Sequence, residues 1–219
     1  MGQFEIFKKY ESDQWFERNK ELLKPMEDIV IQLLDLYDLL DKNSKVLEVG
    51  ASNGYRLAKL HEKYGCICSA VEPSKKAVKD GIDKFPFIKF YQITAEEMDF
   101  HDEFDLVIVN SVLHWIDRKN LFKAVTNIDK ALKMGGYLVI GDFQLPFFVK
   151  NPYHHIKDEV YTYKQPYKNI FLISGSYLEL ASICYNHDTK SFKNIDFKNF
   201  FCVSLLKKQE LYLLQDKVL

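Results

Sequence analysis

Short apolar runs alternate along the chain with segments of helical period. A strand buried on both faces shows a nearly continuous apolar run. In residues 45–49 apolar and polar residues alternate too little for a strand with one solvent-exposed face. Runs of this kind predict strands at residues 45–49, 66–71, 88–93, 104–110, 137–143, 177–185 and 200–207. The alternation occupies nearly all of the 219 residues, which is typical of one α/β domain with a large core.

The first predicted strand runs through Glu48 into a turn of small residues, and a helical period resumes at Tyr55. Gly50 and Gly54 bracket this turn. At Gly50 the missing Cβ lets a ligand approach the main chain, and the free N–H groups at the helix start point to the same place. A dinucleotide-binding turn has glycine at the positions held here by Gly50, Ser52 and Tyr55, so the Tyr argues against a pyrophosphate ligand.

The pattern Glu-x-Gly-x-x-x-Gly resembles motif I of the class I S-adenosylmethionine-dependent methyltransferases, with Ser52 where many members carry a glycine. The resemblance implies a Rossmann-like, seven-stranded, mostly parallel sheet with helices on both faces and an antiparallel last strand. It also implies S-adenosylmethionine as cofactor, held in the first turn by Glu48, Gly50, Ala51, Ser52 and Gly54.

Acidic residues also follow the next two predicted strands. Glu72-Pro73 follows the second, where a carboxylate could accept both ribose hydroxyls, the alternative being a solvated loop residue. Ser74 is the expected N-cap of the next helix. After the third strand the resemblance implies that Ala95-Glu96 contacts the adenine edge, although Thr94 and Glu97 could equally form a capping box.

The loop after the fourth predicted strand completes the expected cofactor site. The resemblance implies that Asn110 and Ser111 lie against the methionine and the sulfonium, and that His114-Trp115 forms the wall between cofactor and substrate. Asp117 can then cap a helix that runs through Lys133 and stops at Gly135-Gly136.

Two helical segments are predicted before the sheet, at residues 12–24 and 25–40, the second opened by Pro25. The first resembles the N-terminal lid of many small-molecule methyltransferases. In such a lid Arg18 could pair with the methionine carboxylate, and a surface ion pair is the alternative. The chain is therefore expected to be one domain (1–219), with a lid (1–44), a cofactor-binding core (45–143), a substrate cover (144–176) and the last two strands (177–207).

Residues 144–176 are rich in proline and aromatic residues and follow the fifth strand, so they are expected to overhang the transferred methyl group. Transfer to a hydroxyl or a protonated amine requires a base. The candidates are His154 and His155, one of them oriented by Asp142, with His114 next. Adjacent histidines seldom both reach one ion, so no metal is expected.

The amino-acid composition excludes some classes of binding partner. Three arginines and a net charge of −1 provide no surface that could track nucleic acid phosphates. The chain shows neither an apolar run long enough to span a membrane nor a signal-peptide layout. Cys66, Cys68, Cys184 and Cys202 match no zinc spacing and are expected to be reduced thiols, the first two on one face of a strand, in a cytoplasmic protein. The Lys-, Asn- and Ile-rich composition suggests a bacterium, and the oligomeric state stays open.

The expected activity is methyl transfer from S-adenosylmethionine to a small molecule, by in-line displacement with a histidine base. A loose resemblance to methyltransferases of bacterial surface-sugar gene clusters, based on the Tyr-His-His run, implies a hydroxyl of a sugar or nucleotide-linked sugar as acceptor. Two alternatives stay open. One is a module that binds the cofactor without turnover. The other is a nicotinamide oxidoreductase, which Ser52 and Tyr55 disfavour.

Overall fold

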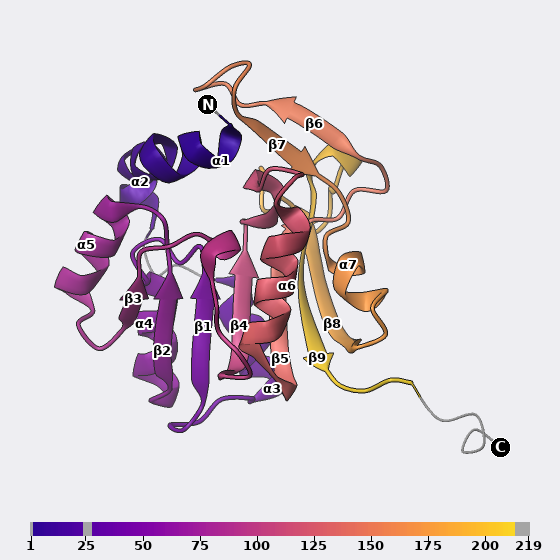
Figure 1. Ribbon diagram of the computed structural model, residues 1–219. Helices are drawn as coiled ribbons and strands as arrows, with labels where there is room; N and C mark the ends of the chain where they lie inside the picture. Colours follow the sequence, from indigo (N-terminus) through magenta and orange to yellow (C-terminus); the bar gives the residue numbers. More distant parts are fainter. Residues whose placement is uncertain (1, 24–27, 213–219) are drawn as a thin grey trace.

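A seven-stranded sheet forms the centre of the protein (Figure 1). The computed structural model describes residues 2–23 and 28–212. The strand order is β3-β2-β1-β4-β5-β9-β8, with β1 to β5 parallel and β9 antiparallel to both of its neighbours. The strands are β1 (Lys45–Val49), β2 (Ile67–Val71), β3 (Lys89–Tyr91), β4 (Phe104–Asn110), β5 (Leu132–Phe143), β8 (Tyr177–Asn186) and β9 (Phe200–Lys208). The predicted mostly parallel sheet with an antiparallel last strand is confirmed.

Helices cover both faces of the sheet. The elements α3 (Ile29–Tyr37) and α4 (Tyr55–Tyr64) contribute to the core on one face, and α6 (Leu121–Ala131) and α7 (Lys168–Leu172) to the core on the other. Along β4, Leu106 and Ile108 enter the first core, while Val107 and Val109 enter the second. Because both faces are buried, the strand reads as an unbroken apolar run in the sequence. The remaining long helix, α5 (Lys75–Lys84), follows β2.

The prediction for the chain between β4 and β5 is wrong at both ends of the helix. The helix is preceded by Asn120 rather than Asp117, because the Asp117 carboxylate accepts the N–H of Lys119 in a turn before the helix begins. The chain then enters β5 at Leu132, which pairs with Phe104 of β4. Gly135 therefore lies inside the strand, with a φ of +83°.

The N-terminus forms one nearly continuous helix, which is longer than predicted. It consists of α1 (Gln3–Ile6), a π-helical segment η1 (Phe7–Glu11), α2 (Ser12–Asn19) and a 3₁₀ turn η2 (Lys20–Leu22). We call residues 3–22 the N-terminal helix. It lies across the carboxyl ends of the strands, above α5 (Figure 1). The predicted start of the second helix, Pro25, lies outside the described residues, and α3 begins at Ile29 with Asp28 as its N-cap.

Residues 144–176 form an antiparallel hairpin, β6 (Val149–Pro152) and β7 (Tyr161–Lys164), followed by α7. The hairpin lies at the same end of the sheet as the N-terminal helix (Figure 1). The two share a small core of Ile6, Tyr153 and Val160. The Gln3 side chain donates to the carbonyl of Tyr161 at 2.8 Å and accepts its N–H at 3.0 Å.

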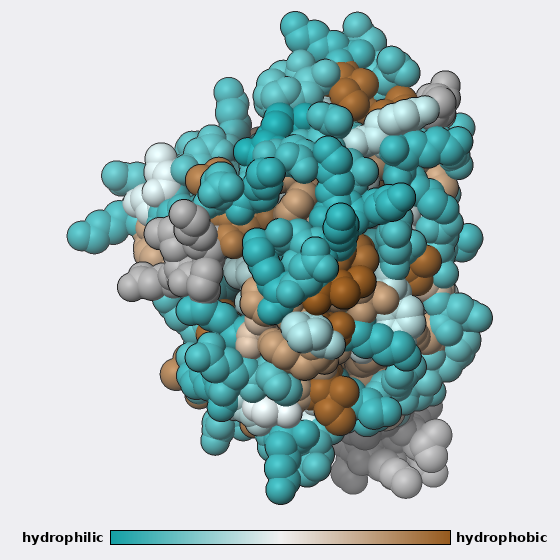
Figure 2. Space-filling view, turned by 90° about the vertical axis from the view of Figure 1, so that its left-hand side faces the viewer, coloured by the Kyte–Doolittle hydropathy of each residue, from teal (hydrophilic) through white to brown (hydrophobic). Residues whose placement is uncertain are grey.

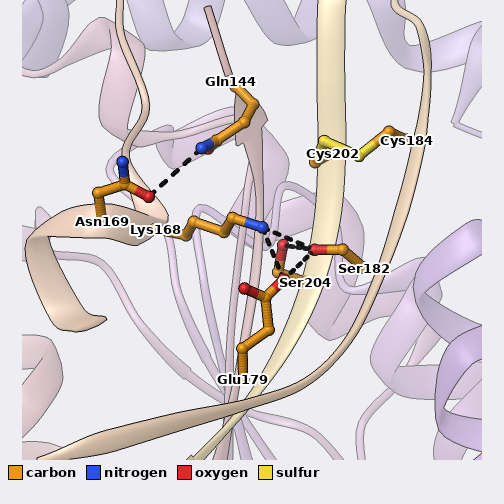
Figure 3. Close-up of a disulfide and its surroundings, with 8 residues drawn as sticks. All are labelled: Gln144, Lys168, Asn169, Glu179, Ser182, Cys184, Cys202 and Ser204. Atoms are coloured by element: carbon orange, nitrogen blue, oxygen red, sulfur yellow. Dashed lines mark hydrogen bonds and ion pairs between the residues drawn. A yellow bond between two sulfur atoms is a disulfide. The ribbon is translucent and has the colours of Figure 1, made fainter. Parts of the chain in front are cut away.

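The expectation of four reduced thiols is wrong for one pair. Cys184 of β8 and Cys202 of β9 are joined by a disulfide (Figure 3). The register places these two residues directly opposite each other on adjacent antiparallel strands, which the sequence, without the register, does not reveal. Cys66 and Cys68 are buried free thiols whose Sγ atoms lie 3.6 Å apart, as their shared strand face predicts.

The outer surface beside α5 is mainly hydrophilic, with apolar residues gathered near the middle of the view (Figure 2). Within residues 2–23 and 28–212, no helix has the length and apolar character needed to cross a membrane.

Candidate active site

A cavity of about 290 Å³ lies between the carboxyl ends of the strands and the N-terminal helix. It is lined by the turn after β1, by the loops after β2, β3 and β4, and by one face of the N-terminal helix. All the predicted cofactor residues except Arg18 and Gly54 line it. These are Glu48, Gly50, Ala51, Ser52, Glu72, Pro73, Ala95, Glu96, Asn110 and Ser111. The parallel sheet brings these residues together from four separate strand ends.

The turn after β1 depends on backbone conformations that favour glycine. Gly50 has a φ of +71°, and a Cβ at this position would overlap Cγ2 of Val112 in the loop after β4. Gly50 therefore allows two loops of the site to pack together. Gly54, with a φ of +77°, precedes the first turn of α4, and a Cβ added to it would meet Ile88 and Phe90, so its role is to shape the turn.

Glu72 is buried at the cavity and is held by two backbone groups. The N–H of Ser74 donates to Oε1 and the N–H of Ser52 donates to Oε2, each at 2.9 Å. Burial raises the pKa of Glu72 to about 7, although both N–H groups favour the ionised form. Each carboxylate oxygen keeps a lone pair for a ligand hydroxyl.

Glu48 belongs to a buried ion network that the sequence did not predict. Arg56 of α4 pairs with Glu48 Oε1, and its Nε donates to Asp28 at 2.9 Å. Burial raises the pKa of Glu48 to about 7 even though Arg56 opposes the shift. Glu48 Oε2 and the Oγ of Ser52 are buried and have no hydrogen-bond partner among the described residues, while both side chains belong to residues that line the cavity. Two polar atoms are thus available to a ligand.

Ala95 and Glu96, which line the cavity, lie in the 3₁₀ turn η3 (Ala95–Glu97). Thr94 and Glu97 form the capping box that was the alternative interpretation of this segment. The two interpretations are compatible, because the capping box shapes the turn while Ala95 and Glu96 line the cavity.

The loop after β4 is fixed by contacts with β5. The side chain of Asn110 occupies the space that a Cβ on Gly141 would fill. The N–H of Ser111 donates to the carbonyl of Gly141 at 2.7 Å, and Ser111 has a φ of +60°. This loop continues into η4 (Leu113–Trp115), where Trp115 lines the cavity and His114 does not. A wall between cofactor and substrate at this position stays a prediction.

The N-terminal helix forms the roof of the cavity. Its contribution consists of Phe4, Phe7, Lys8, Ser12 and Trp15, which recur at helical spacing and therefore share one face. The rings of Phe7 and Trp115 lie 5.5 Å apart. The π-helical segment in this roof is a feature often found at functional sites. Phe4 and Phe7 were missed because the predicted helix began after them.

His114 and Asp142 form a buried pair at the carboxyl ends of β4 and β5. The Nδ1 of His114 lies 2.9 Å from Oδ1 of Asp142, and the N–H of His114 donates to Oδ2 at 3.2 Å. The carboxylate holds the proton on Nδ1 and leaves Nε2 as an acceptor. The His114 ring lies 5.2 Å from that of Trp115.

The structure does not bring Arg18, His154 or His155 to the cavity. Arg18 pairs with the buried Glu11 and donates to the Tyr153 hydroxyl at 2.9 Å, which fastens the N-terminal helix to the hairpin. His154 and His155 are exposed in the turn between β6 and β7, and their rings lie tilted against each other and edge-on to Tyr153. None of the cavity lining comes from residues 144–176. The hairpin instead supports the roof from outside.

Residues 2–23 and 28–212 contain no group of three or more His, Cys, Asp or Glu side chains placed to hold a metal ion.

A family model described as a methyltransferase domain matches residues 47–140. Among curated proteins, an uncharacterized protein of Methanocaldococcus jannaschii is 28% identical over 162 residues, which cover 73% of this chain and 71% of that protein. An uncharacterized methyltransferase of Alkaliphilus oremlandii is 26% identical over 140 residues, covering 59% of this chain and 64% of that protein.

Solved structures share the fold. The 1,6-didemethyltoxoflavin-N1-methyltransferase of Burkholderia thailandensis, bound to 1,6-didemethyltoxoflavin and S-adenosylhomocysteine, has a TM-score of 0.69 and 14% identity, with 91% of this chain and 85% of that chain covered. The N-methyltransferase NodS of Bradyrhizobium japonicum, in complex with S-adenosylhomocysteine, has a TM-score of 0.62 and 17% identity. The match covers 90% of this chain and 98% of that chain.

Proposed function

We propose that this S-adenosylmethionine-dependent methyltransferase methylates a small molecule with a flat apolar face, and that His114, oriented by Asp142, accepts the proton from it. The observation that carries the proposal is the composition of the cavity. Its floor presents the carboxylates Glu48 and Glu72, whereas its roof presents aromatic side chains.

The residues on the floor fit the cofactor. Glu72 can accept the two ribose hydroxyls, because each of its oxygens already takes one backbone N–H and keeps another lone pair. The unpartnered Oε2 of Glu48 suits the methionine ammonium group, and the unpartnered hydroxyl of Ser52 suits a polar atom beside it. Gly50 also lines the cavity, but the space of its missing Cβ is filled by Val112 and is not left open for the ligand. When bound, S-adenosylmethionine supplies the electrophilic methyl group.

The aromatic residues favour an acceptor with an apolar surface. Phe4, Phe7 and Trp115 can pack against a planar ring and exclude water from the reacting atoms. The neighbour that binds 1,6-didemethyltoxoflavin and the neighbour named as an N-methyltransferase make nitrogen as reasonable a nucleophile as oxygen. The sugar hydroxyl expected from the Tyr-His-His run stays a prediction, and His154 and His155 stand outside the cavity.

In this mechanism the walls of the cavity align the acceptor with the methyl group for in-line displacement. With S-adenosylmethionine bound, the acceptor lone pair would form the new bond to the methyl carbon, and the electron pair of the broken carbon–sulfur bond would stay on sulfur. His114 does not line the cavity itself but lies beside the lining residue Trp115, so the acceptor proton passes to its Nε2 through one water, and Asp142 stabilises the imidazolium that forms.

The proposal predicts that His114→Asn retains affinity for S-adenosylhomocysteine and loses turnover by about 100- to 10,000-fold. Asparagine can keep the buried hydrogen bond to Asp142 but has no group in place of Nε2. Binding is measured by calorimetry. Turnover is measured by mass detection of methylated products from a panel of hydroxylated and aminated heteroaromatic compounds and nucleotide-linked sugars.

The matched control is the double variant His154→Gln/His155→Gln, which changes two exposed imidazoles and should retain full turnover. Loss of turnover in this control with an active His114→Asn variant would reverse the assignment of the base. Methylation restricted to the sugars would overturn the apolar acceptor. Binding of S-adenosylhomocysteine without turnover on any compound of the panel would favour a non-catalytic module.

A further inference from the structure

The N-terminal helix touches the cofactor-binding floor through Asp13. The Oδ1 of Asp13 accepts the hydroxyl of Ser74 at 2.6 Å and the N–H of Lys76 at 3.0 Å. Ser74 is the N-cap of α5, and its Oγ also accepts the N–H of Ala77 at 3.1 Å. The roof of the cavity is thus fastened to the start of the helix that follows β2.

The same Ser74 also holds Glu72. Its N–H donates to Glu72 Oε1 at 2.9 Å, so Ser74 contacts the roof with its side chain and the floor carboxylate with its main chain. Ser74 is 1% exposed; its bonds to Glu72 and Ala77 are buried, and its bond to Asp13 is partly buried. A displacement of Asp13 therefore changes the support of the carboxylate that faces the cavity.

We propose that Asp13 is a positioning residue that couples closure of the N-terminal helix to recognition of the cofactor ribose by Glu72. With the helix closed, Asp13 fixes Ser74, and Ser74 aims Glu72 at the two ribose hydroxyls. With the helix open, the serine loses its charged acceptor and the carboxylate loses its orientation. This inference rests on the proposed role of Glu72 in cofactor binding.

A neighbouring contact offers a matched control. Glu17 lies one helical turn after Asp13 and also reaches α5, where its Oε1 is 3.4 Å from the ammonium of Lys76. The contact is solvent-exposed and does not involve Ser74 or Glu72. Exposed ion pairs of this kind contribute little to the stability of a protein. Asp13→Ala and Glu17→Ala each remove one acid from the same helix, and only the first removes a partner of Ser74.

The first measurement compares adenosine with 2′,3′-dideoxyadenosine, which lacks both ribose hydroxyls. Calorimetry on the full chain should show that Asp13→Ala lowers the affinity for adenosine by at least about fivefold, which is the lower end of the coupling typically measured between two sites. Its affinity for 2′,3′-dideoxyadenosine should equal that of the wild type. Glu17→Ala should bind both compounds as the wild type does.

The second measurement reports the position of the roof. Trp15 and Trp115 are the two tryptophans of the chain, and both line the cavity. In a Trp115→Phe background, Trp15 in the N-terminal helix is the single tryptophan. Adenosine should protect it from acrylamide quenching in that background and in Trp115→Phe/Glu17→Ala, but not in Trp115→Phe/Asp13→Ala at equal saturation.

The outcomes separate this inference from the proposed function. If the wild type binds adenosine no better than 2′,3′-dideoxyadenosine, the role of Glu72 in ribose binding is wrong. If the wild type distinguishes them and a folded Asp13→Ala protein distinguishes them equally well, the coupling is wrong while the cofactor site stands. An equal loss for both compounds would also overturn the coupling, because it would mean general damage to the site.

Discussion

Several residues of the site are determined by the space around them. Gly50 must leave room for Val112, and Gly141 must leave room for Asn110. Ser52 and Ser111 adopt left-handed conformations with φ of +51° and +60°. Backbone strain of this kind is kept where surrounding contacts compensate for it, and it is common in binding sites. At the residue scale, the cavity is therefore built by close packing between the loops after β1 and β4.

Gly50 allows a direct test. Gly50→Ala should destabilise the protein through its positive φ and, in addition, through overlap with Val112, which typically adds about 1 to 3 kcal/mol. Gly135→Ala is the matched control, because Gly135 has a φ of +83° and no atom within 4 Å of an added Cβ. Urea unfolding measures the free energy of unfolding of both variants. Equal losses would show that the contact with Val112 costs nothing.

At the scale of elements, the sequence predicts best where a strand has both faces buried. Strands β1 and β4 have the predicted bounds, since each apolar run ends where the chain reaches the cavity, β1 at Val49 and β4 at Asn110. The start of β5 was missed because Gly135-Gly136 normally ends an element, whereas here it lies inside a strand. The disulfide was missed because it depends on the register of β8 against β9.

In the candidate site too, local sequence patterns predict some residues, while others depend on contacts between distant parts of the chain. Residues at strand ends were predicted, because the fold brings those ends together wherever the sheet is parallel. The aromatic roof, the Arg56 network and the outward position of His154 and His155 depend on how the N-terminal helix and the hairpin dock. These contacts join residues far apart in the sequence, and no local pattern encodes them.

The disulfide should stabilise the edge formed by β8 and β9. It closes a loop of 18 residues, which corresponds to about 3 kcal/mol in the chain-entropy model. Cys184→Ser/Cys202→Ser should lose about this amount of unfolding free energy. Dithiothreitol should lower the wild-type midpoint to a similar extent and leave the double variant unchanged. A wild-type midpoint that does not respond to the reductant would contradict a role of the disulfide in stability.

At the scale of the whole molecule, the site is divided between a core and a cover. The sheet and its flanking helices carry the carboxylates and the glycine turn, while the N-terminal helix and the hairpin close over them. Several long-range contacts fasten the N-terminal helix to the rest of the molecule. Among them are Gln3 to Tyr161 and Trp115, Lys8 to Glu97, and Asp13 to Ser74.

These fastenings span long stretches of chain. Gln3 and Tyr161 are 158 residues apart, and Asp13 and Ser74 are 61 apart. Closing such distances costs chain entropy that only a formed sheet can repay, so the N-terminal helix should dock late in folding and detach first. Its amides should exchange with deuterium through a local opening, while those of β1 and β4 should exchange only through global unfolding. Equal protection of both regions in hydrogen-exchange mass spectrometry would mean that cover and sheet unfold as one cooperative unit.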